Sequence, residues 1–174
     1  DDGSTDPTPE IARRLGERLA LSRPQLDLLE RAALLHDVGK IGIELDTLSS
    51  PMQLTAEEVR LIRRHPALGS ELVGDVEFLA DTAPAIRHHH ERYDGAGYPD
   101  GLAAEDIPLL ARLMAVADSY DAMTSNRAYR PAMTRQEALA EIERVAGTQL
   151  DRRIALQFTA MLGDEDAEGD VRET

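Results

Sequence analysis

One stretch of the chain, PQLDLLERAALLHDVG at residues 24–39, places leucine and alanine at helical spacing and ends close to a histidine–aspartate pair. Ser22 and Pro24 are typical of a helix start, and Gly39 is typical of a helix end. The apolar run AALL directly before the pair indicates a helix that is buried in a core. The fold must therefore bring other elements around this helix and its polar end.

The remaining sequence carries further helix signals and few strand signals. Aromatic residues make up only 3% of the chain, so Leu, Ala, Ile, Val and Met must form the core. Thr55 with Glu58 and Thr134 with Glu137 form two capping boxes, each of which predicts a helix start. We expect an all-α bundle of seven or eight helices, with the others over residues 10–20, 56–65, 67–74, 77–91, 107–120, 135–147 and 152–163.

The chain has the size of one domain. Residues 1–9 are polar and rich in helix breakers, so we expect a flexible segment there. Residues 10–162 form the expected domain, and residues 163–174 form an acidic tail that we expect to be disordered. Because the chain starts at Asp1 rather than at methionine, we expect it to be part of a longer protein.

The net charge of −14 at pH 7 argues against nonspecific binding to nucleic acid or to an anionic membrane. An anionic substrate would need local positive charge from a metal ion or from arginines. The absence of cysteine excludes a thiolate metal site. With no apolar run of membrane-spanning length and no secretory signal, we expect a cytoplasmic location.

The five histidines are concentrated where helices are expected to end, at positions 36, 65, 88, 89 and 90. The negative end of a helix dipole favours a cation, and imidazole with carboxylate suits Mn, Fe or Zn. Successive residues on a helix are turned by about 100°, so at most two of the three consecutive histidines can face one site. We select His89 and His90 as ligands, and we regard His88 as a bystander or a residue behind the ligands.

Simpler interpretations of these residues remain open. A single histidine such as His65 is more often a carbonyl cap or a surface residue than a ligand. A buried Asp37 needs a partner, which is either a metal ion or Lys40. Asp118, in LMAVADSYDAM, poses the same question, and its alternatives are a buried cap or an ion pair with an arginine.

Three segments, AALLHDVGKIGI, HHERYDGAGYPDGL and IPLLARLMAVADSYDAMTSNRAYR, together resemble the HD-GYP family of metal-dependent phosphohydrolases. The motifs occur in the family's order, and the similarity covers roughly residues 10–162. The resemblance implies an HD-type helical bundle around two or three metal ions.

The resemblance also assigns roles by position. The implied metal ligands are His36, Asp37, His65, His89, His90 and Asp118, with Asp37 bridging two ions. Lys40 would lie beside the scissile phosphate, and Arg127 and Arg130 match phosphate-binding positions. The GYP loop, with Gly95, Gly97, Tyr98 and Pro99, would border the site and offer a contact for a partner protein. Tyr98 would stack on a guanine or fill an ordinary core or turn position.

The function implied by the resemblance is hydrolysis of cyclic di-GMP to linear pGpG in bacterial second-messenger signalling, with GMP left open as a further product. Asp37 and Lys40 would be the catalytic residues, and two divalent ions such as Fe or Mn would be the cofactors. An upstream sensory or receiver domain is expected. The alternative is a degenerate domain that binds cyclic di-GMP or a protein without hydrolysing it.

Two departures from the family motivate that alternative. Many members carry a further histidine on the helix before the HD pair, whereas the corresponding segment here, Ser4 to Glu10, has none. The connector after KIGI has Glu44, Leu45 and Ser50 where the family usually has a proline, an acid and a lysine. We therefore expect the metal position of His36, Asp37 and Asp118 to be short of a ligand, and no third metal ion.

Overall fold

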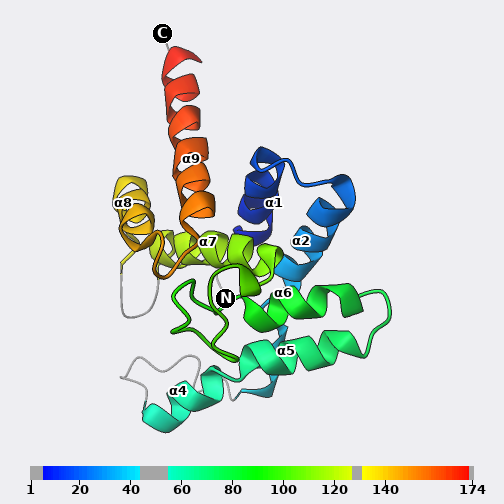
Figure 1. Ribbon diagram of the computed structural model, residues 1–174. Helices are drawn as coiled ribbons and strands as arrows, with labels where there is room; N and C mark the ends of the chain where they lie inside the picture. Colours follow the sequence, from blue (N-terminus) through cyan, green and yellow to red (C-terminus); the bar gives the residue numbers. More distant parts are fainter. Residues whose placement is uncertain (1–5, 44–54, 127–130, 173–174) are drawn as a thin grey trace.

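The protein is described by a computed structural model that covers residues 6–43, 55–126 and 131–172 (Figure 1). These residues form helices and loops, with one isolated β-bridge between Ala146 and Leu150. The expected all-α class is confirmed. The α-helices are α1 (Thr8–Arg18), α2 (Arg23–Leu35), α4 (Ala56–Ile62), α5 (His65–Gly74), α6 (Ala83–His88), α7 (Leu109–Thr124), α8 (Arg135–Val145) and α9 (Arg152–Arg172), and the 3-10 helices are η1 (Val38–Gly42), η2 (Ala80–Thr82) and η3 (Ala104–Asp106).

Helix α7 is the centre of the bundle and lies across the middle of the molecule, between α1 and α6 (Figure 1). It buries five residues, Ala111, Leu113, Met114, Val116 and Ala117, which cover more than one face of the helix. They join a single core with side chains of the surrounding helices, among them Leu15, Leu29, Ile86, Ile142 and Phe158. Because α7 is buried, its residue Asp118 lies near the end of α2 at His36 and near His90, which follows α6.

Helix α2 starts as expected, with a capping box between Ser22 and Gln25, but it ends earlier than expected. The α-helix stops at Leu35, and the chain tightens into η1. Gly39 lies inside η1, where a Cβ atom would approach the His65 carbonyl oxygen to 2.0 Å and the Gly69 nitrogen to 2.6 Å. Gly39 therefore allows η1 to contact the start of α5, which brings the histidine–aspartate pair next to His65.

The helix expected over residues 77–91 is wrong in its first part. Helix α6 covers only Ala83–His88, and it follows a turn and the short helix η2. The Thr82 hydroxyl, which is buried, donates to the Leu79 carbonyl, and Pro84 lies in the first turn of α6, where a missing N–H costs nothing. The short α6 ends at three consecutive histidines.

Helices α8 and α9 complete the bundle. Thr134 and Glu137 form the expected capping box of α8, and the Asp151 carboxylate accepts the Arg153 amide at the start of α9. Helix α9 continues to Arg172, beyond the expected end at Gly163. Asp164, just past the expected end, pairs with Arg18 of α1 at 2.7 Å. The domain boundaries expected from the sequence stay predictions.

None of the helices described in the structure combines the length and the apolar content that a membrane span requires.

Candidate metal centre

His36 closes α2 at its C-cap and is buried, with 5% of its surface exposed. Its ring nitrogen Nδ1 lies 2.7 Å from the Ala33 carbonyl oxygen. A carbonyl only accepts hydrogen bonds, so Nδ1 carries the proton and donates it. Nε2 is then the nitrogen that faces the site, and in a neutral ring it is the nitrogen that can bind a metal.

His65 and His89 repeat this arrangement and are each only 1% exposed. His65 Nδ1 donates to the Ile62 carbonyl at 2.8 Å, and His89 Nδ1 donates to the Ile86 carbonyl at 2.6 Å. His65 opens α5 rather than closing the preceding helix, because Pro66 is tolerated in a first turn. In each case the carbonyl belongs to the residue three positions earlier, and Nε2 is turned towards the interior.

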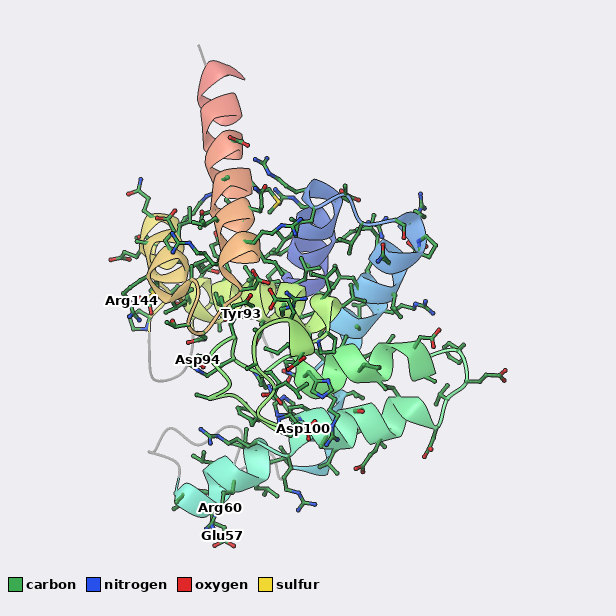
Figure 2. The ribbon with its side chains drawn as sticks, viewed as in Figure 1. Glu57, Arg60, Tyr93, Asp94, Asp100 and Arg144 are labelled. Atoms are coloured by element: carbon green, nitrogen blue, oxygen red, sulfur yellow. The ribbon has the colours of Figure 1, made fainter. Side chains whose placement is uncertain are left out.

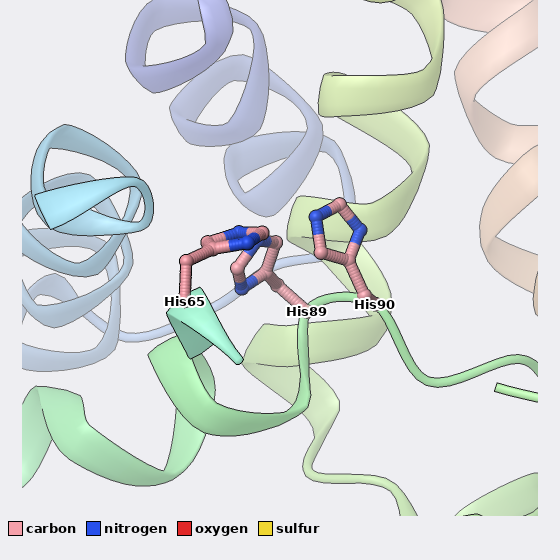
Figure 3. A group of neighbouring side chains, drawn as sticks. All are labelled: His65, His89 and His90. Carbon is pink, nitrogen blue, oxygen red and sulfur yellow. The ribbon is translucent and has the colours of Figure 1, made fainter. Parts of the chain in front are cut away.

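The two Nε2 atoms of His65 and His89 face each other at 3.4 Å (Figure 3). Burial, with the adjacent His90 and His36 adding to it, holds the pKa of His89 well below its ordinary value, so its ring is neutral. Nδ1 of each ring donates to a backbone carbonyl, so Nε2 is the nitrogen of each ring that is left to bind a cation between them.

The Asp37 carboxylate lies at the mouth of the same cluster. Its Oδ1 is 3.2 Å from His65 Nε2, and its Oδ2 is 3.6 Å from His36 Nε2. Burial raises the pKa of Asp37, but His65, His36 and Lys40 outweigh it and hold that pKa well below its usual range. The carboxylate is therefore ionised, and each of its oxygens is directed at a different histidine.

His90 and Asp118 extend the cluster on the side of α7. The His90 ring lies 4.0 Å from the His89 ring, and its Nδ1 is 4.0 Å from Asp118 Oδ2. Asp118 Oδ1 is 3.9 Å from His36 Nε2. Burial, together with the neighbouring His65, lowers the pKa of His90 to about 3, so this ring is also neutral.

The six ligands implied by the sequence lie close together, and five of them form two overlapping groups, while Asp118 lies beside these groups and belongs to neither. The donor atoms of His65, His89 and His90 lie within 4.8 Å of one another, and so do those of His36, Asp37 and His89. His89 belongs to both groups. Imidazole nitrogen with carboxylate oxygen and no sulfur suits divalent Fe, Mn or Zn.

The ion pair between Asp37 and Lys40, which is the simpler alternative to a metal ion, does form, but it satisfies only one of the two carboxylate oxygens. The Lys40 ammonium contacts Asp37 Oδ2, as an ion pair requires. Asp37 Oδ1, however, is buried with no hydrogen-bond partner among the described residues. It faces His65 Nε2 at 3.2 Å. A bound metal ion would satisfy both atoms, and the lysine alone satisfies neither, so the residues present fit a metal ion.

The segment before the HD pair adds no donor to the described clusters. Within residues 6–10, the Asp6 carboxylate accepts the Thr8 amide at 2.9 Å and so serves the start of α1. Glu10 is exposed on α1. Neither residue belongs to the two donor groups found among the described residues. The described part of this segment therefore supplies no further donor to the position nearest His36 and Asp118.

The loop after the histidines is folded back onto them. Tyr98 N donates to the His90 carbonyl at 3.3 Å, and the Tyr98 ring lies 5.1 Å from the His90 ring. The bond between Tyr98 and Pro99 is cis, and Gly95 has a left-handed φ of 79°. At Gly97 a Cβ atom would lie 2.2 Å from the Arg92 nitrogen. The GYP loop thus borders the candidate site, as the resemblance implied.

Glu91 is a residue that the sequence reasoning missed. It is 4% exposed, and its Oε1 accepts the amides of Asp100 at 2.7 Å and Gly101 at 3.0 Å. Asp100 in turn binds Arg87 and His88, so His88 holds the loop and is not in either donor group. The sequence did offer a signal for Glu91, because this charged residue directly follows the two histidines that were selected as ligands.

A cavity of about 370 Å³ opens beside the cluster, between α7 and α8. His90 and Asp118 line one side of it, and Glu141 and Gln149 line another. A larger cavity of about 620 Å³ lies elsewhere, at Leu19, Leu109 and Ile154, and includes none of the candidate ligands. The smaller cavity has the size of a ligand pocket and adjoins the metal donors, so we regard it as the functional one.

Several predicted positions fall outside the described residues. They are the phosphate-binding candidates Arg127 and Arg130 and the connector positions Glu44, Leu45 and Ser50. Their roles stay predictions. Lys40 is described, and its ammonium is held at the rim of the cluster by Asp37.

Known proteins are similar to this chain in sequence and in fold. The chain is 44% identical over 145 residues to the cyclic di-GMP phosphodiesterase response regulator RpfG of Xanthomonas campestris, covering 82% of this chain and 38% of that protein. It is 36% identical over 137 residues to the 3′3′-cGAMP-specific phosphodiesterase 3 of Vibrio cholerae, covering 79% of this chain and 30% of that protein. The chain thus spans about a third of the length of these relatives.

A solved structure has the same architecture. The Bdellovibrio bacteriovorus protein Bd1817, described as an HDG"Y"P protein, superposes with a TM-score of 0.73 at 22% identity, covering 91% of this chain and 51% of that one. A sequence model of the HD domain family matches residues 3–154. The chain therefore belongs to the HD domain family, and its resemblance to the HD-GYP branch is confirmed.

Proposed function

We propose that this chain is a metal-dependent phosphodiesterase that opens cyclic di-GMP to linear pGpG. The observation that carries the proposal is the convergence of imidazole Nε2 atoms and the Asp37 carboxylate on one point, where Asp37 Oδ1 is buried with no hydrogen-bond partner among the described residues. Such a donor set is costly without a cation and favourable with one. The relatives named as cyclic dinucleotide phosphodiesterases support the choice of reaction.

Two divalent ions fit the two overlapping donor groups, and we propose Fe or Mn on the chemistry of the ligands. When bound, such ions supply Lewis-acid polarisation of the phosphodiester. His65, His89 and His90 would hold one ion, and His36, Asp37 and Asp118 would serve the other, with Asp37 reaching both.

The other residues would orient the substrate. The Lys40 ammonium lies at the rim of the cluster and can donate hydrogen bonds to a phosphoryl oxygen. The carbonyls of Ala33, Ile62 and Ile86 keep the three buried rings in the tautomer that presents Nε2. Arg127 and Arg130 remain proposed phosphate contacts, since they match the family pattern.

The proposal is tested by turnover on metal-loaded protein. Protein purified without oxygen is stripped with a chelator, reloaded with Fe²⁺ or Mn²⁺, and incubated with cyclic di-GMP, 3′3′-cGAMP and mononucleotide cyclic phosphates. Chromatography should show pGpG only in the reloaded samples, and GMP if hydrolysis continues. Turnover that survives both chelation and Asp37→Ala would exclude the proposal.

A second function is favoured by one observation. No residue of the described segment 6–10 joins the donor groups, so the position near His36 has no donor from the segment where many family members carry a further histidine. A chain that loads only one ion would bind cyclic di-GMP and signal without cleaving it. Calorimetric binding of cyclic di-GMP without product after long incubation in Fe²⁺ or Mn²⁺ would establish this receptor function.

The context of the domain is also proposed. Because the chain spans about a third of its relatives, we propose that a sensory or receiver domain precedes it in the whole protein. We propose the GYP loop as the surface for a protein partner, since it lies at the rim of the site. A cytoplasmic location stays a prediction.

A further inference from the structure

Arg63 lies in the junction between α4 and α5 and is exposed to solvent. Its guanidinium carbon lies over the ring of Tyr98, 5.1 Å from the ring centroid. The Tyr98 ring lies in turn 5.1 Å from the His90 ring, with 33° between the two planes. The Tyr98 ring therefore lies between a candidate metal ligand and an arginine at the surface.

The middle of this series is firmly held. The Tyr98 amide donates to the His90 carbonyl, and Glu91 accepts the amides of Asp100 and Gly101 just beyond Pro99. Gly97 packs against the Glu91 and Arg92 backbone with no room for a Cβ. The ring under Arg63 is therefore fixed relative to the metal cluster, although Arg63 itself belongs to another element.

Stacking uses the flat face of a guanidinium and leaves its N–H edge available to a ligand. That edge matches a phosphate, which it can bind through two parallel hydrogen bonds. The rest of the chain is unfavourable to anions because its net charge is −14. Lys40 is already engaged by Asp37, so a second cation at the rim would matter for an anionic substrate.

A cyclic dinucleotide has two phosphodiesters, and only one can lie on the metal ions during a single cleavage. We propose that Arg63, seated on Tyr98, binds the second phosphodiester and thereby selects cyclic dinucleotides over smaller phosphodiesters. This inference rests on the proposed function and adds a substrate-binding residue to it. The residue acts on binding of the substrate and does not touch the bond that breaks.

The test compares Arg63→Ala with the wild type on cyclic di-GMP and on bis(p-nitrophenyl) phosphate, which has a single phosphodiester. Loss of one charged hydrogen-bond pair should raise KM for cyclic di-GMP about tenfold and leave kcat nearly unchanged. The rise should be much smaller for bis(p-nitrophenyl) phosphate. Arg63→Lys should recover only part of the loss, since lysine keeps the charge but not the flat fork.

Arg60→Ala is the matched control. Arg60 is an exposed arginine of the same segment, its Nε donates to the Ala56 carbonyl of its own helix, and it lies on the outer side of α4 (Figure 2). This variant removes the same charge and should keep the wild-type KM. The double variant with Tyr98→Leu should lose little more than Tyr98→Leu alone, because the ring supports the arginine.

The outcomes separate the two proposals. A wild-type protein that neither hydrolyses nor binds cyclic di-GMP would overturn the proposed function and this inference with it. An active wild type with equal KM values for Arg63→Ala and Arg60→Ala would overturn only the role of Arg63. If the wild type binds without turnover, the same comparison is made on the dissociation constant from calorimetry, with the same expected ratio.

Discussion

A backbone carbonyl three positions earlier decides which ring nitrogen each of the buried histidines 36, 65 and 89 presents to the site. The sequence identified these histidines, because an HD pair and a double histidine beside glycine-rich turns are specific in combination. The tautomer of each ring could not be predicted from the sequence, because it depends on which backbone carbonyl the ring meets where a helix ends or begins. The role of Glu91 could not be predicted either, because its partners are the amides of Asp100 and Gly101, which only the folded loop brings close to it.

His89→Ala should lower the metal content, because the His89 donor atom lies within 4.8 Å of the other donor atoms of both groups. We expect the metal content of protein purified without oxygen to fall from about two ions per chain to one or none, with turnover lost. His88→Ala is the control, since His88 binds Asp100 and should leave the metal content unchanged. Elemental analysis of both variants checks this, and equal metal content in the two would contradict it.

Glu91→Ala should destabilise the fold by about 1–3 kcal/mol, because two amides lose their buried acceptor. Glu91→Gln keeps one acceptor oxygen and should retain most of the stability. Urea unfolding with fluorescence or circular dichroism measures both values. Wild-type stability in the alanine variant would show that the loop does not depend on this residue.

At the scale of elements, the helices were predictable wherever local chemistry determines them. The capping boxes at Thr55 and Thr134 form as expected, because both partners lie within four residues. The helix expected over residues 77–91 failed because Thr82 and Pro84 favour a late start, and tertiary burial of Thr82 is not visible in sequence. Gly39 looked like a helix stop, whereas its actual role is close contact between η1 and α5.

Gly39→Ala should push η1 away from α5 and so separate Asp37 from His65. The added Cβ has backbone atoms at 2.0 and 2.6 Å, which cannot yield as a flexible side chain would. We expect a loss of roughly 1–3 kcal/mol of stability and a lower metal content. Thermal unfolding and elemental analysis measure these effects.

Gly74→Ala is the matched control for that change, because a Cβ at Gly74 meets nothing within 4 Å at the end of α5. It should leave the metal content unchanged and alter stability by at most about 1 kcal/mol, in the stabilising direction. If both alanine variants behave alike, the close contact at Gly39 is not what positions the pair.

At the scale of the molecule, the bundle draws its donors from segments far apart in sequence: the end of α2, the start of α5, the end of α6 and the middle of α7. The sequence motifs indicated that these donors belong together, and the resemblance supplied the arrangement. The contact between Arg63 and Tyr98 could not be predicted, since it joins a helix junction to a loop that has no pairing pattern with it.

Because the donors come from four separate elements, metal binding should stabilise the whole fold. Binding to the folded chain alone raises stability by mass action, and the unfolded chain cannot reproduce the cluster. We expect the Tm to rise by several degrees when Mn²⁺ is added to chelator-stripped protein. His89→Ala should show a much smaller rise, and an equal rise in both would place the stabilising ion elsewhere.

The most direct measurement is anomalous X-ray scattering from crystals grown with Mn²⁺ or Fe²⁺ under exclusion of oxygen. The account predicts two anomalous peaks, one among His65, His89 and His90 and one beside His36 and Asp118, with Asp37 touching both. The peaks should disappear from crystals soaked in a chelator. No peak within the histidine cluster, in crystals that hold the metal elsewhere, would contradict the account.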